Sequence, residues 1–337
     1  MQGKIENICI RGMISAVPRN EVCNKEYVDK IQDHRIQRQI KLTGIDKRRV
    51  TVGKQKASDL AAVAADELLE RLHWDRNSID ILIFVTQSPD LSRPSSAFLI
   101  QERLGLGKQC LAYDINFGCA GYVTGLTTIC SILQNTRGRG LLLVGESNAV
   151  EGDGADRNAL LEGDAAAATA LEFSQGVSQI DFVHYGDGSR ANLLYKPFNK
   201  PGYMDGNAVL LFGLSDVADS IKKFMTDRDI DSEEIDYYIF HQAQKMIVDG
   251  IVQETGIPEN KVLMSCQNFG NTSSASIPLT LCSSLKKGQK KGKIKVLMCG
   301  YGIGLAWGIV LAEMEGDSIF PLIETDYAYD DREKFGI

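Results

Sequence analysis

The sequence contains the stretch Ile79-Asp80-Ile81-Leu82-Ile83-Phe84-Val85 and, later, the similar stretch Ile235-Asp236-Tyr237-Tyr238-Ile239-Phe240-His241. Each is followed by one short phrase, which reads Asn116-Phe117-Gly118-Cys119 in the first copy and Asn268-Phe269-Gly270-Asn271 in the second. Residues 141–145 and 167–173 likewise correspond to residues 296–300 and 307–313. Such internal similarity indicates a duplicated architecture. The copies differ at reactive positions, because one carries Cys119 and the other carries His241 and Asn271.

The length of the chain agrees with two structural units. Its 337 residues exceed a typical single core, so two units of roughly 170 residues are expected. A hydrophobic content of 44% and a charged content of 24% are those of an ordinary globular protein. We therefore expect a first half at residues 1–174, a second half at 175–315 and an appended acidic surface segment at 316–337.

Apolar β-forming runs alternate with segments of helical periodicity. We expect strands at residues 5–16, 79–85, 111–115, 140–144, 235–240, 262–265, 294–298 and 305–313, and helices at 57–72, 95–104, 120–133, 209–225, 245–255 and 274–285. Residues 19–49 have no counterpart in the second half and are expected to be an insertion. The alternation predicts βαβ units and a layered α/β fold in which helices cover the sheets.

Composition argues against several classes of function. A net charge of −7 disfavours a broad nucleic-acid surface. The lysine run at 286–295 is expected to be a solvated turn, with docking of an acidic partner as the alternative. The sequence has no transmembrane run or signal peptide, and its eight cysteines lack metal-ligand spacing. We therefore expect a cytoplasmic protein with reduced cysteines and without a metal site.

Cys119 is a candidate nucleophile. It follows Gly118 at the junction of a predicted strand and an apolar helix. The dipole and free N–H groups of a helix N-terminus favour the thiolate, which is the nucleophilic form. The alternative is a small buried apolar residue, because free cysteine is among the most buried residue types.

His241 and Asn271 are candidate partners of this cysteine. His241 stands where the first half has Val85, and its alternative is a histidine satisfied within the core. Asn271 precedes Thr272 and Ser273, where a helix N-cap is the alternative. Because all three residues lie beyond the carboxyl ends of predicted strands, the usual ligand position in open α/β sheets, we expect them to form one site.

A cysteine, a histidine and an asparagine could also belong to a papain-like hydrolase. The duplicated strand and helix order does not suit that class. The glycine-rich segment 300–305 allows close approach of the backbone to a ligand and can supply an N–H group to an oxyanion. Its GxGxG pattern is weak evidence for a nucleotide site, because no βαβ fingerprint accompanies it.

The sequence resembles the thiolase-fold condensing enzymes, and most closely the β-ketoacyl-(acyl carrier protein) synthase III family. The matching stretches are Thr43-Gly44-Ile45, Asn116 to Tyr122, Asp156-Arg157, Gly163-Asp164-Ala165, Met204-Asp205-Gly206, His241-Gln242-Ala243, Gly270 to Pro278 and Gly300 to Gly308. They occur in the family's order across almost the whole chain. The resemblance implies a thiolase-like fold with αβαβα layers, and a homodimer.

The resemblance also implies a reaction. Cys119 would take an acyl group from acyl-coenzyme A as a thioester, with the backbone N–H groups of Cys119 and Gly304 binding the oxyanion. His241 and Asn271 would bind the carbonyl of a malonyl thioester, carried by an acyl carrier protein, while carbon dioxide leaves. The resemblance places coenzyme A against Arg157, Arg38, Gly206 and Asn207, and implies no permanently bound cofactor and no metal.

The match fails where the family receives its substrates. Arg38 replaces the aromatic residue that stacks on adenine, Leu42 replaces a basic residue, and Gln244 replaces an asparagine. The basic residues that dock the carrier align with Leu211, Met246, Gln253 and Glu254. Losing these charges weakens electrostatic steering of an acidic carrier, so a specialised pathway is expected. Acyl chain length depends on residues such as Phe98, Leu160 and Leu161.

Two alternatives to condensation stay open. One is an acyltransferase that moves the acyl group from Cys119 to a small acceptor without forming a carbon–carbon bond. The other is a catalytically silent subunit that packs on an active homologue. The presence of Cys119, His241 and Asn271 together disfavours the silent subunit, because a scaffold needs none of them.

Overall fold

Two six-stranded sheets form the frame of the protein. The structure is a computed structural model that describes residues 1–28, 34–149, 160–176, 179–197, 200, 202–285 and 292–336. The first sheet has the order β16-β2-β8-β7-β5-β6 and the second has the order β1-β9-β15-β14-β12-β13. The first comprises β16 (Ile323–Thr325), β2 (Ile8–Pro18), β8 (Ala165–Phe173), β7 (Arg139–Glu146), β5 (Ile81–Val85) and β6 (Leu111–Ile115). The second comprises β1 (Gln2–Glu6), β9 (Gln179–Gly186), β15 (Ala306–Glu315), β14 (Lys293–Gly302), β12 (Tyr237–Phe240) and β13 (Val262–Leu263).

Five strands of each sheet follow the same order along the chain. β2, β8, β7, β5 and β6 correspond to β9, β15, β14, β12 and β13, with parallel and antiparallel pairs in the same places. β5 and β12 are the strands that the quoted stretches predicted, and both are almost entirely buried. The duplicated α/β fold predicted from the sequence is therefore confirmed.

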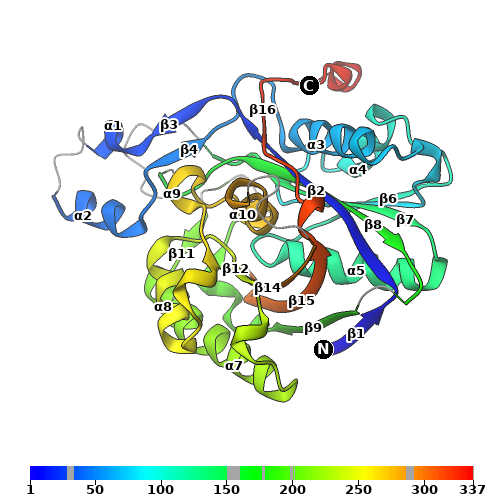
Figure 1. Ribbon diagram of the computed structural model, residues 1–337. Helices are drawn as coiled ribbons and strands as arrows, with labels where there is room; N and C mark the ends of the chain where they lie inside the picture. The colour runs from blue at the N-terminus through cyan, green and yellow to red at the C-terminus, as the bar shows by residue number, and fades with distance from the viewer. Residues whose placement is uncertain are drawn as a thin grey trace.

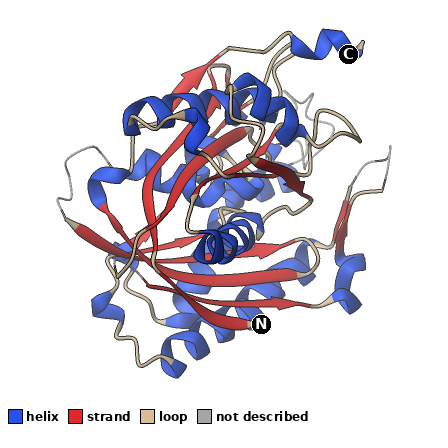
Figure 2. Cartoon of the chain, turned by 90° about the vertical axis from the view of Figure 1, so that its right-hand side faces the viewer, coloured by secondary structure: helices blue, strands red, loops and turns tan. Residues whose placement is uncertain are grey.

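Helices form three layers around the two sheets, in the order αβαβα (Figure 1, Figure 2). α3 (Ala57–Leu72) and α4 (Ser96–Arg103) cover the outer face of the first sheet. α7 (Ala218–Asp227) and α8 (Lys245–Thr255) cover the outer face of the second. α5 (Gly121–Thr136) and α10 (Ser276–Ser284) lie between the sheets. The remaining helices are α1 (Asn24–Val28), α2 (His34–Thr43), α6 (Gly206–Phe212) and α9 (Cys266–Phe269).

The central helix α5 approaches the first sheet closely because it carries glycine. A Cβ atom at Gly121 would lie 2.7 Å from Val85, and one at Gly125 would lie 2.8 Å from Leu142. No ordinary side chain fits in that space. α5 also packs on β14 and β15 of the second sheet, so its start is fixed by both halves.

Each end of the chain pairs with the sheet of the other predicted half. The single strand expected at residues 5–16 is wrong, because Asn7, with φ 63°, separates β1 from β2. β1 pairs with β9 in the second sheet, whereas β2 belongs to the first. β16, from the segment expected to lie on the surface, pairs in parallel with β2. Ile319 and Arg332 of that segment are buried, because it packs on the first half.

The region of the first half expected to be an insertion and its surroundings form a rim beside the second sheet. β3 (Glu21–Cys23) pairs with β4 (Lys47–Arg49), and α2 contacts α8. A separate hairpin, β10 (Leu194–Tyr195) with β11 (Tyr203–Met204), precedes α6. The two hairpins occupy equivalent places, because β3-β4 lies between β2 and α3 and β10-β11 lies between β9 and α7. The region expected to be an insertion therefore has a counterpart in the second half.

Candidate active site

Cys119, His241 and Asn271 all lie around one residue, Ser273. Cys119 stands between β6 and α5, with its sulfur 4.0 Å from the Ser273 hydroxyl. Asn271 Oδ1 accepts a hydrogen bond of 2.9 Å from the Ser273 N–H group. The backbone of Ser273 also forms a hydrogen bond with the imidazole of His241, and His241 directly follows β12. Residues far apart in the sequence are thus brought together, as predicted.

Ser273 was not singled out from the sequence. It has a φ of 49°, which is rare for a residue with a side chain. This conformation turns its N–H group toward Asn271 while its hydroxyl faces Cys119. With Oδ1 held in this way, the amino group of Asn271 is the end that can donate to a ligand.

The backbone of Asn271 is fixed by the first half of the protein. Its N–H group donates to the Leu161 carbonyl over 2.7 Å, and its carbonyl accepts from the Gly163 N–H over 3.0 Å. Glu162 and Asn271 form an isolated parallel bridge. The site therefore depends on contact between the two halves.

The turn between β14 and β15 lies over Cys119. A Cβ atom at Gly302 would lie 2.6 Å from Cys119 Cβ and 2.9 Å from its sulfur, so only glycine fits there. The backbone of Ile303 forms a hydrogen bond with the Cys119 thiol. Gly304, the predicted oxyanion donor, is the next residue of this turn and has a φ of 145°.

Burial shifts the thiol of Cys119 toward its protonated form. Removal from water raises its pKa to about 11, although hydrogen bonds with the Ile303 backbone and the Ser273 hydroxyl lower it. The sequence predicted a stabilised thiolate from the helix dipole. Desolvation at the start of α5 acts in the opposite direction to that expected effect.

His241 is a neutral, tightly held imidazole. It is 1% exposed, its Nδ1 lies 2.8 Å from Ser276 Oγ, and its ring meets the Tyr301 ring edge to face at 5.4 Å. The Tyr301 hydroxyl donates to the His241 carbonyl over 3.1 Å. Burial lowers the pKa of His241 to about 3, partly offset by the Ser273 backbone.

We expect the imidazole signals of His241 in an NMR titration to keep the neutral position from pH 5 to pH 8, because protonation would place a charge in this dry site. Its pKa lies below the unfolded value, so the stability it contributes is complete above about pH 6.5 and is lost as the pH falls toward 3. A titration midpoint between pH 6 and pH 7 would contradict this assignment.

A buried carboxyl group lies behind the nucleophile turn. Glu146, at the end of β7, is 2% exposed and accepts hydrogen bonds from the Gln87 N–H at 2.9 Å and the Ser88 hydroxyl at 2.8 Å. Burial raises its pKa to about 8, against the effect of these bonds. The Gln87 side chain donates to Asn116 Oδ1 over 3.3 Å. Glu146 and Gln87 were not predicted to belong to the site, because nothing nearby in the sequence links them to Cys119.

The predicted coenzyme A residues lie on separate elements. Arg38 is exposed on α2, and Gly206 and Asn207 are exposed in the first turn of α6. Asp205 caps α6 by accepting a hydrogen bond of 3.0 Å from the Ala208 N–H. Arg157 lies outside the described residues. The binding roles of all four stay predictions.

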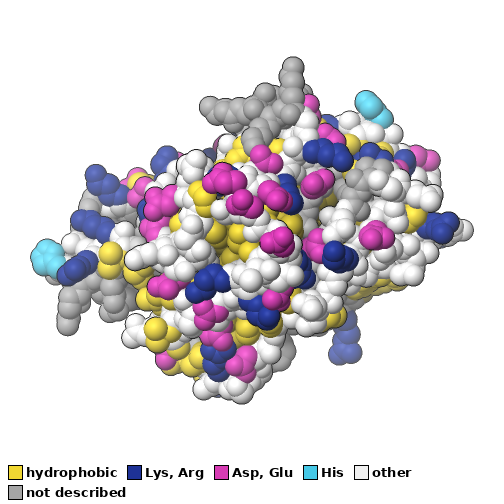
Figure 3. All heavy atoms as spheres, turned by 60° about the horizontal axis from the view of Figure 1, so that its bottom comes forward, with side chains coloured by type: hydrophobic (Ala, Val, Ile, Leu, Met, Phe, Trp, Pro, Cys, Tyr) yellow, Lys and Arg dark blue, Asp and Glu magenta, His cyan; other side chains and the backbone are white. Residues whose placement is uncertain are grey.

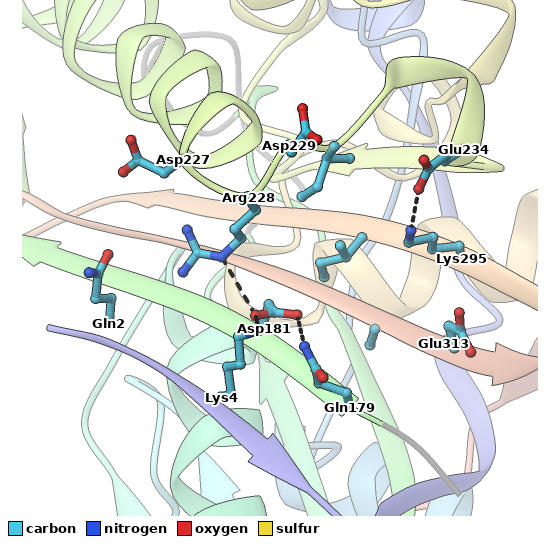
Figure 4. Close-up of a pocket in the computed structure, with 13 residues that line it drawn as sticks. Gln2, Lys4, Gln179, Asp181, Asp227, Arg228, Asp229, Glu234, Lys295 and Glu313 are labelled. Atoms are coloured by element: carbon cyan, nitrogen blue, oxygen red, sulfur yellow. Dashed lines mark hydrogen bonds and ion pairs between the residues drawn. The ribbon is translucent and has the colours of Figure 1, made fainter.

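One surface hollow lies away from this site. It measures about 780 Å³ and is lined by residues of β1, β9, β14, β15 and the end of α7. Figure 4 shows Arg228 and Gln179 reaching toward Asp181 at its floor. Figure 3 shows acidic and basic side chains interspersed over the lower face of the molecule.

The described part of the chain contains no group of three or more His, Cys, Asp or Glu side chains placed to hold a metal ion. None of the helices in this part is long and apolar enough to cross a membrane.

The duplicated layered fold, with a cysteine in one half and a histidine and an asparagine in the other, defines a condensing enzyme of the thiolase fold. The family models of 3-oxoacyl-[acyl-carrier-protein] synthase III match residues 113–188 and, for its C-terminal part, residues 225–314. The chain belongs to the β-ketoacyl-[acyl-carrier-protein] synthase III family, a family of acyltransferases.

Individual relatives cover nearly the whole chain. The β-ketoacyl-[acyl-carrier-protein] synthase III of Lactococcus lactis subsp. lactis (strain IL1403) is 34% identical over 318 residues, which are 88% of this chain and 96% of the relative. That of Neisseria gonorrhoeae (strain NCCP11945) is 33% identical over 324 residues, with 90% and 98% covered. The crystal structure of 3-oxoacyl-(acyl-carrier protein) synthase from Burkholderia xenovorans LB400 is 32% identical and has a TM-score of 0.91, with 96% and 99% covered.

Proposed function

We propose that the protein catalyses a decarboxylative condensation between an acyl group from acyl-coenzyme A and a malonyl thioester, giving a β-ketoacyl thioester. The observation that carries this proposal is the meeting of Cys119, His241 and Asn271 around Ser273. Family membership supports it. We expect the enzyme to act as a cytoplasmic homodimer.

The first half of the reaction takes place at Cys119. Its sulfur attacks the thioester carbonyl of acyl-coenzyme A, and coenzyme A leaves with the thiol proton. The N–H groups of Cys119 and Gly304 are assigned to the oxyanion that develops. The acyl group is then held on sulfur, which divides one difficult condensation into two transfers.

The second half uses His241 and Asn271. Both are neutral donors, because His241 has a pKa of about 3 and Asn271 is held through its amide oxygen. They are assigned to the carbonyl oxygen of the malonyl thioester, where negative charge accumulates as carbon dioxide leaves. The resulting enolate attacks the Cys119 thioester, forms the new carbon–carbon bond and releases the sulfur.

The surface at the aligned docking positions supports a carrier that is not recruited by charge. Leu211 is 65% exposed and Met246 is 38% exposed, and Gln253 and Glu254 are exposed without a positive charge. Lys245, the basic residue beside Met246, is paired with Asp249. Apolar rather than electrostatic contact is therefore expected to orient the acceptor thioester here.

We expect the purified protein to form a β-ketoacyl product from a short acyl-coenzyme A and malonyl thioester, with loss of one carbon dioxide per product. Mass spectrometry of the product, with malonyl-coenzyme A and malonyl-carrier supplied in parallel, tests this and identifies the acceptor. An acylated product that retains no malonyl carbons would instead support transfer to an acceptor without condensation.

A further inference from the structure

The C-terminal segment at residues 316–336 lies beyond the part of the chain that the family models match, which ends at residue 314. It is nevertheless built into the first half. β16 extends the first sheet, and a final 3₁₀ turn, Asp331–Phe335, lies beside α3 and α4 (Figure 1). A segment that the family match does not include thus packs beside elements that position the site.

Arg332 is the buried centre of this attachment. It is 4% exposed and binds Asp59 of α3 with both guanidinium arms, at 2.8 and 2.9 Å. It also donates to the carbonyls of Lys54 and Tyr329, and to Asp90 Oδ1 over 3.2 Å. A charge buried to this degree is stable only while its partners stay in place.

A second anchor of the same segment is Asp331, whose partner Arg103 also lies 3.3 Å from Asp59. Asp331 binds Arg103 of α4 with both carboxylate oxygens, each at 2.8 Å. Surface pairs join Lys54 to Glu333 and Lys334 to Glu102. The contacts of Asp331, Glu333 and Lys334 hold the segment against α4 and nearby surface residues. The hydrogen bond from Arg332 to Asp90 instead reaches the loop between β5 and α4.

The side chain of Asp90 is held by Arg332. The Asp90 side chain is 0% exposed, and its Oδ2 is buried without a hydrogen-bond partner. Among the described residues, Arg332 is the one cation within ion-pair distance of it. The Asp90 N–H group donates to Ser96 Oγ at the start of α4 over 2.9 Å. The position of this loop is therefore coupled to the presence of the C-terminal segment.

The other end of the same loop touches the turn that carries the nucleophile. Thr86 donates its N–H to the Ile115 carbonyl over 3.1 Å, and Glu146 holds Gln87 and Ser88. The Gln87 side chain bonds Asn116, and its carbonyl lies so close to Gly118 that a Cβ atom there would overlap it. Gln87 thus lies directly on the turn before Cys119.

We propose that Arg332 is a positioning residue for the reaction at Cys119: by pairing with Asp90, the C-terminal segment fixes the loop at residues 86–95, and Gln87 of that loop fixes the Asn116–Gly118 turn. The inference rests on the proposed function for its effect on rate. Its structural part, coupling between the segment and the turn, does not depend on the substrate.

The test compares Asp90→Asn with Asp331→Asn in the full-length protein. Replacing Arg332 itself would leave buried carboxylates unpaired and endanger the fold, so the partner on each side is changed instead. Both variants weaken attachment of the segment and are expected to lower the melting temperature. Asp90→Asn alone is expected to slow acylation of Cys119, by about tenfold, because a small displacement of the nucleophile is costly.

Two further measurements separate positioning from stability. Hydrogen exchange of the peptide covering residues 111–120 is expected to rise in Asp90→Asn and to stay native in Asp331→Asn. Gln87→Ala is expected to slow acylation to a similar extent without a change in melting temperature. When Gln87→Ala is combined with Asp90→Asn, the acylation rate should fall little further than in either single variant, because both substitutions release the same turn before Cys119.

Native exchange at residues 111–120 in Asp90→Asn, or equal acylation rates in both Asp variants, would overturn the inference. So would a double variant in which the two rate losses multiply. If the native protein takes no acyl group from any acyl-coenzyme A, the proposed function fails, while the exchange comparison still decides the coupling.

Discussion

A Cys119→Ala variant is expected to gain no mass from any acyl-coenzyme A and to lose condensation activity by on the order of 10³-fold or more. The reason is covalent: sulfur is the only atom at this position that can carry the acyl group. Intact-mass spectrometry after incubation with short and medium acyl-coenzyme A provides the measurement. The fold should persist, because alanine fits where the thiol lay.

Cys9→Ala is the matched control. Cys9, like Cys119, is a free and partly exposed cysteine, but it lies in β2 and faces no part of the site. It should be acylated to the native extent at Cys119. An equal mass gain in native protein and Cys119→Ala would reject the nucleophile assignment.

His241→Ala and Asn271→Ala are each expected to lower malonyl decarboxylation by about 10²- to 10³-fold, because each removes a neutral donor to the developing enolate oxygen. Acylation of Cys119 should continue in both, since neither group is assigned to that step. The measurement is carbon dioxide release from a malonyl thioester after Cys119 has been acylated to completion.

His184→Ala serves as the control for removing a half-buried histidine. Burial lowers the pKa of His184 to about 4, as it does for His241 to a greater degree, and its Nε2 lies 2.9 Å from Thr127 Oγ1 rather than in the site. It should retain decarboxylation. If both His241→Ala and Asn271→Ala decarboxylate at the native rate, the second half of the mechanism is wrong.

The two assignments together describe a division of work between the duplicated halves. Cys119 follows β6 in the first half, and Asn271 follows the corresponding strand β13 and helix α9 in the second. His241 directly follows β12, where the first half has Val85 at the end of β5. We assign storage of the acyl group to one half and activation of the extender to the other.

The inner elements of the fold could be predicted because their patterns are local. α3, β6 and α8 begin and end where helical or strand periodicity predicted. β1 and β2 were merged, because both are apolar β-forming runs and only their partners in different sheets separate them. The pairing of β16 with β2 depends on contact between the chain ends, which no local pattern records.

The three candidate residues could also be selected from the sequence, since each lies beyond a strand end. The residues that hold these three in place could not be predicted from the sequence. Ser273, Glu146 and Gln87 act through distances set by packing. The raised pKa of the Cys119 thiol likewise follows from desolvation, which depends on how the chain packs around it.

The sequence by itself determined the duplication, the alternation of strands and helices, and the placement of Cys119, His241 and Asn271 at strand ends, because periodicity and repeats are properties of neighbouring residues. Only the tertiary structure decided which elements of the two halves meet. It set the conformation of Ser273 between them, the neutrality of His241, and the burial of Arg332 against the loop beside Cys119. Each of these depends on desolvation and on contacts between distant segments, which exist only once the two sheets have packed together.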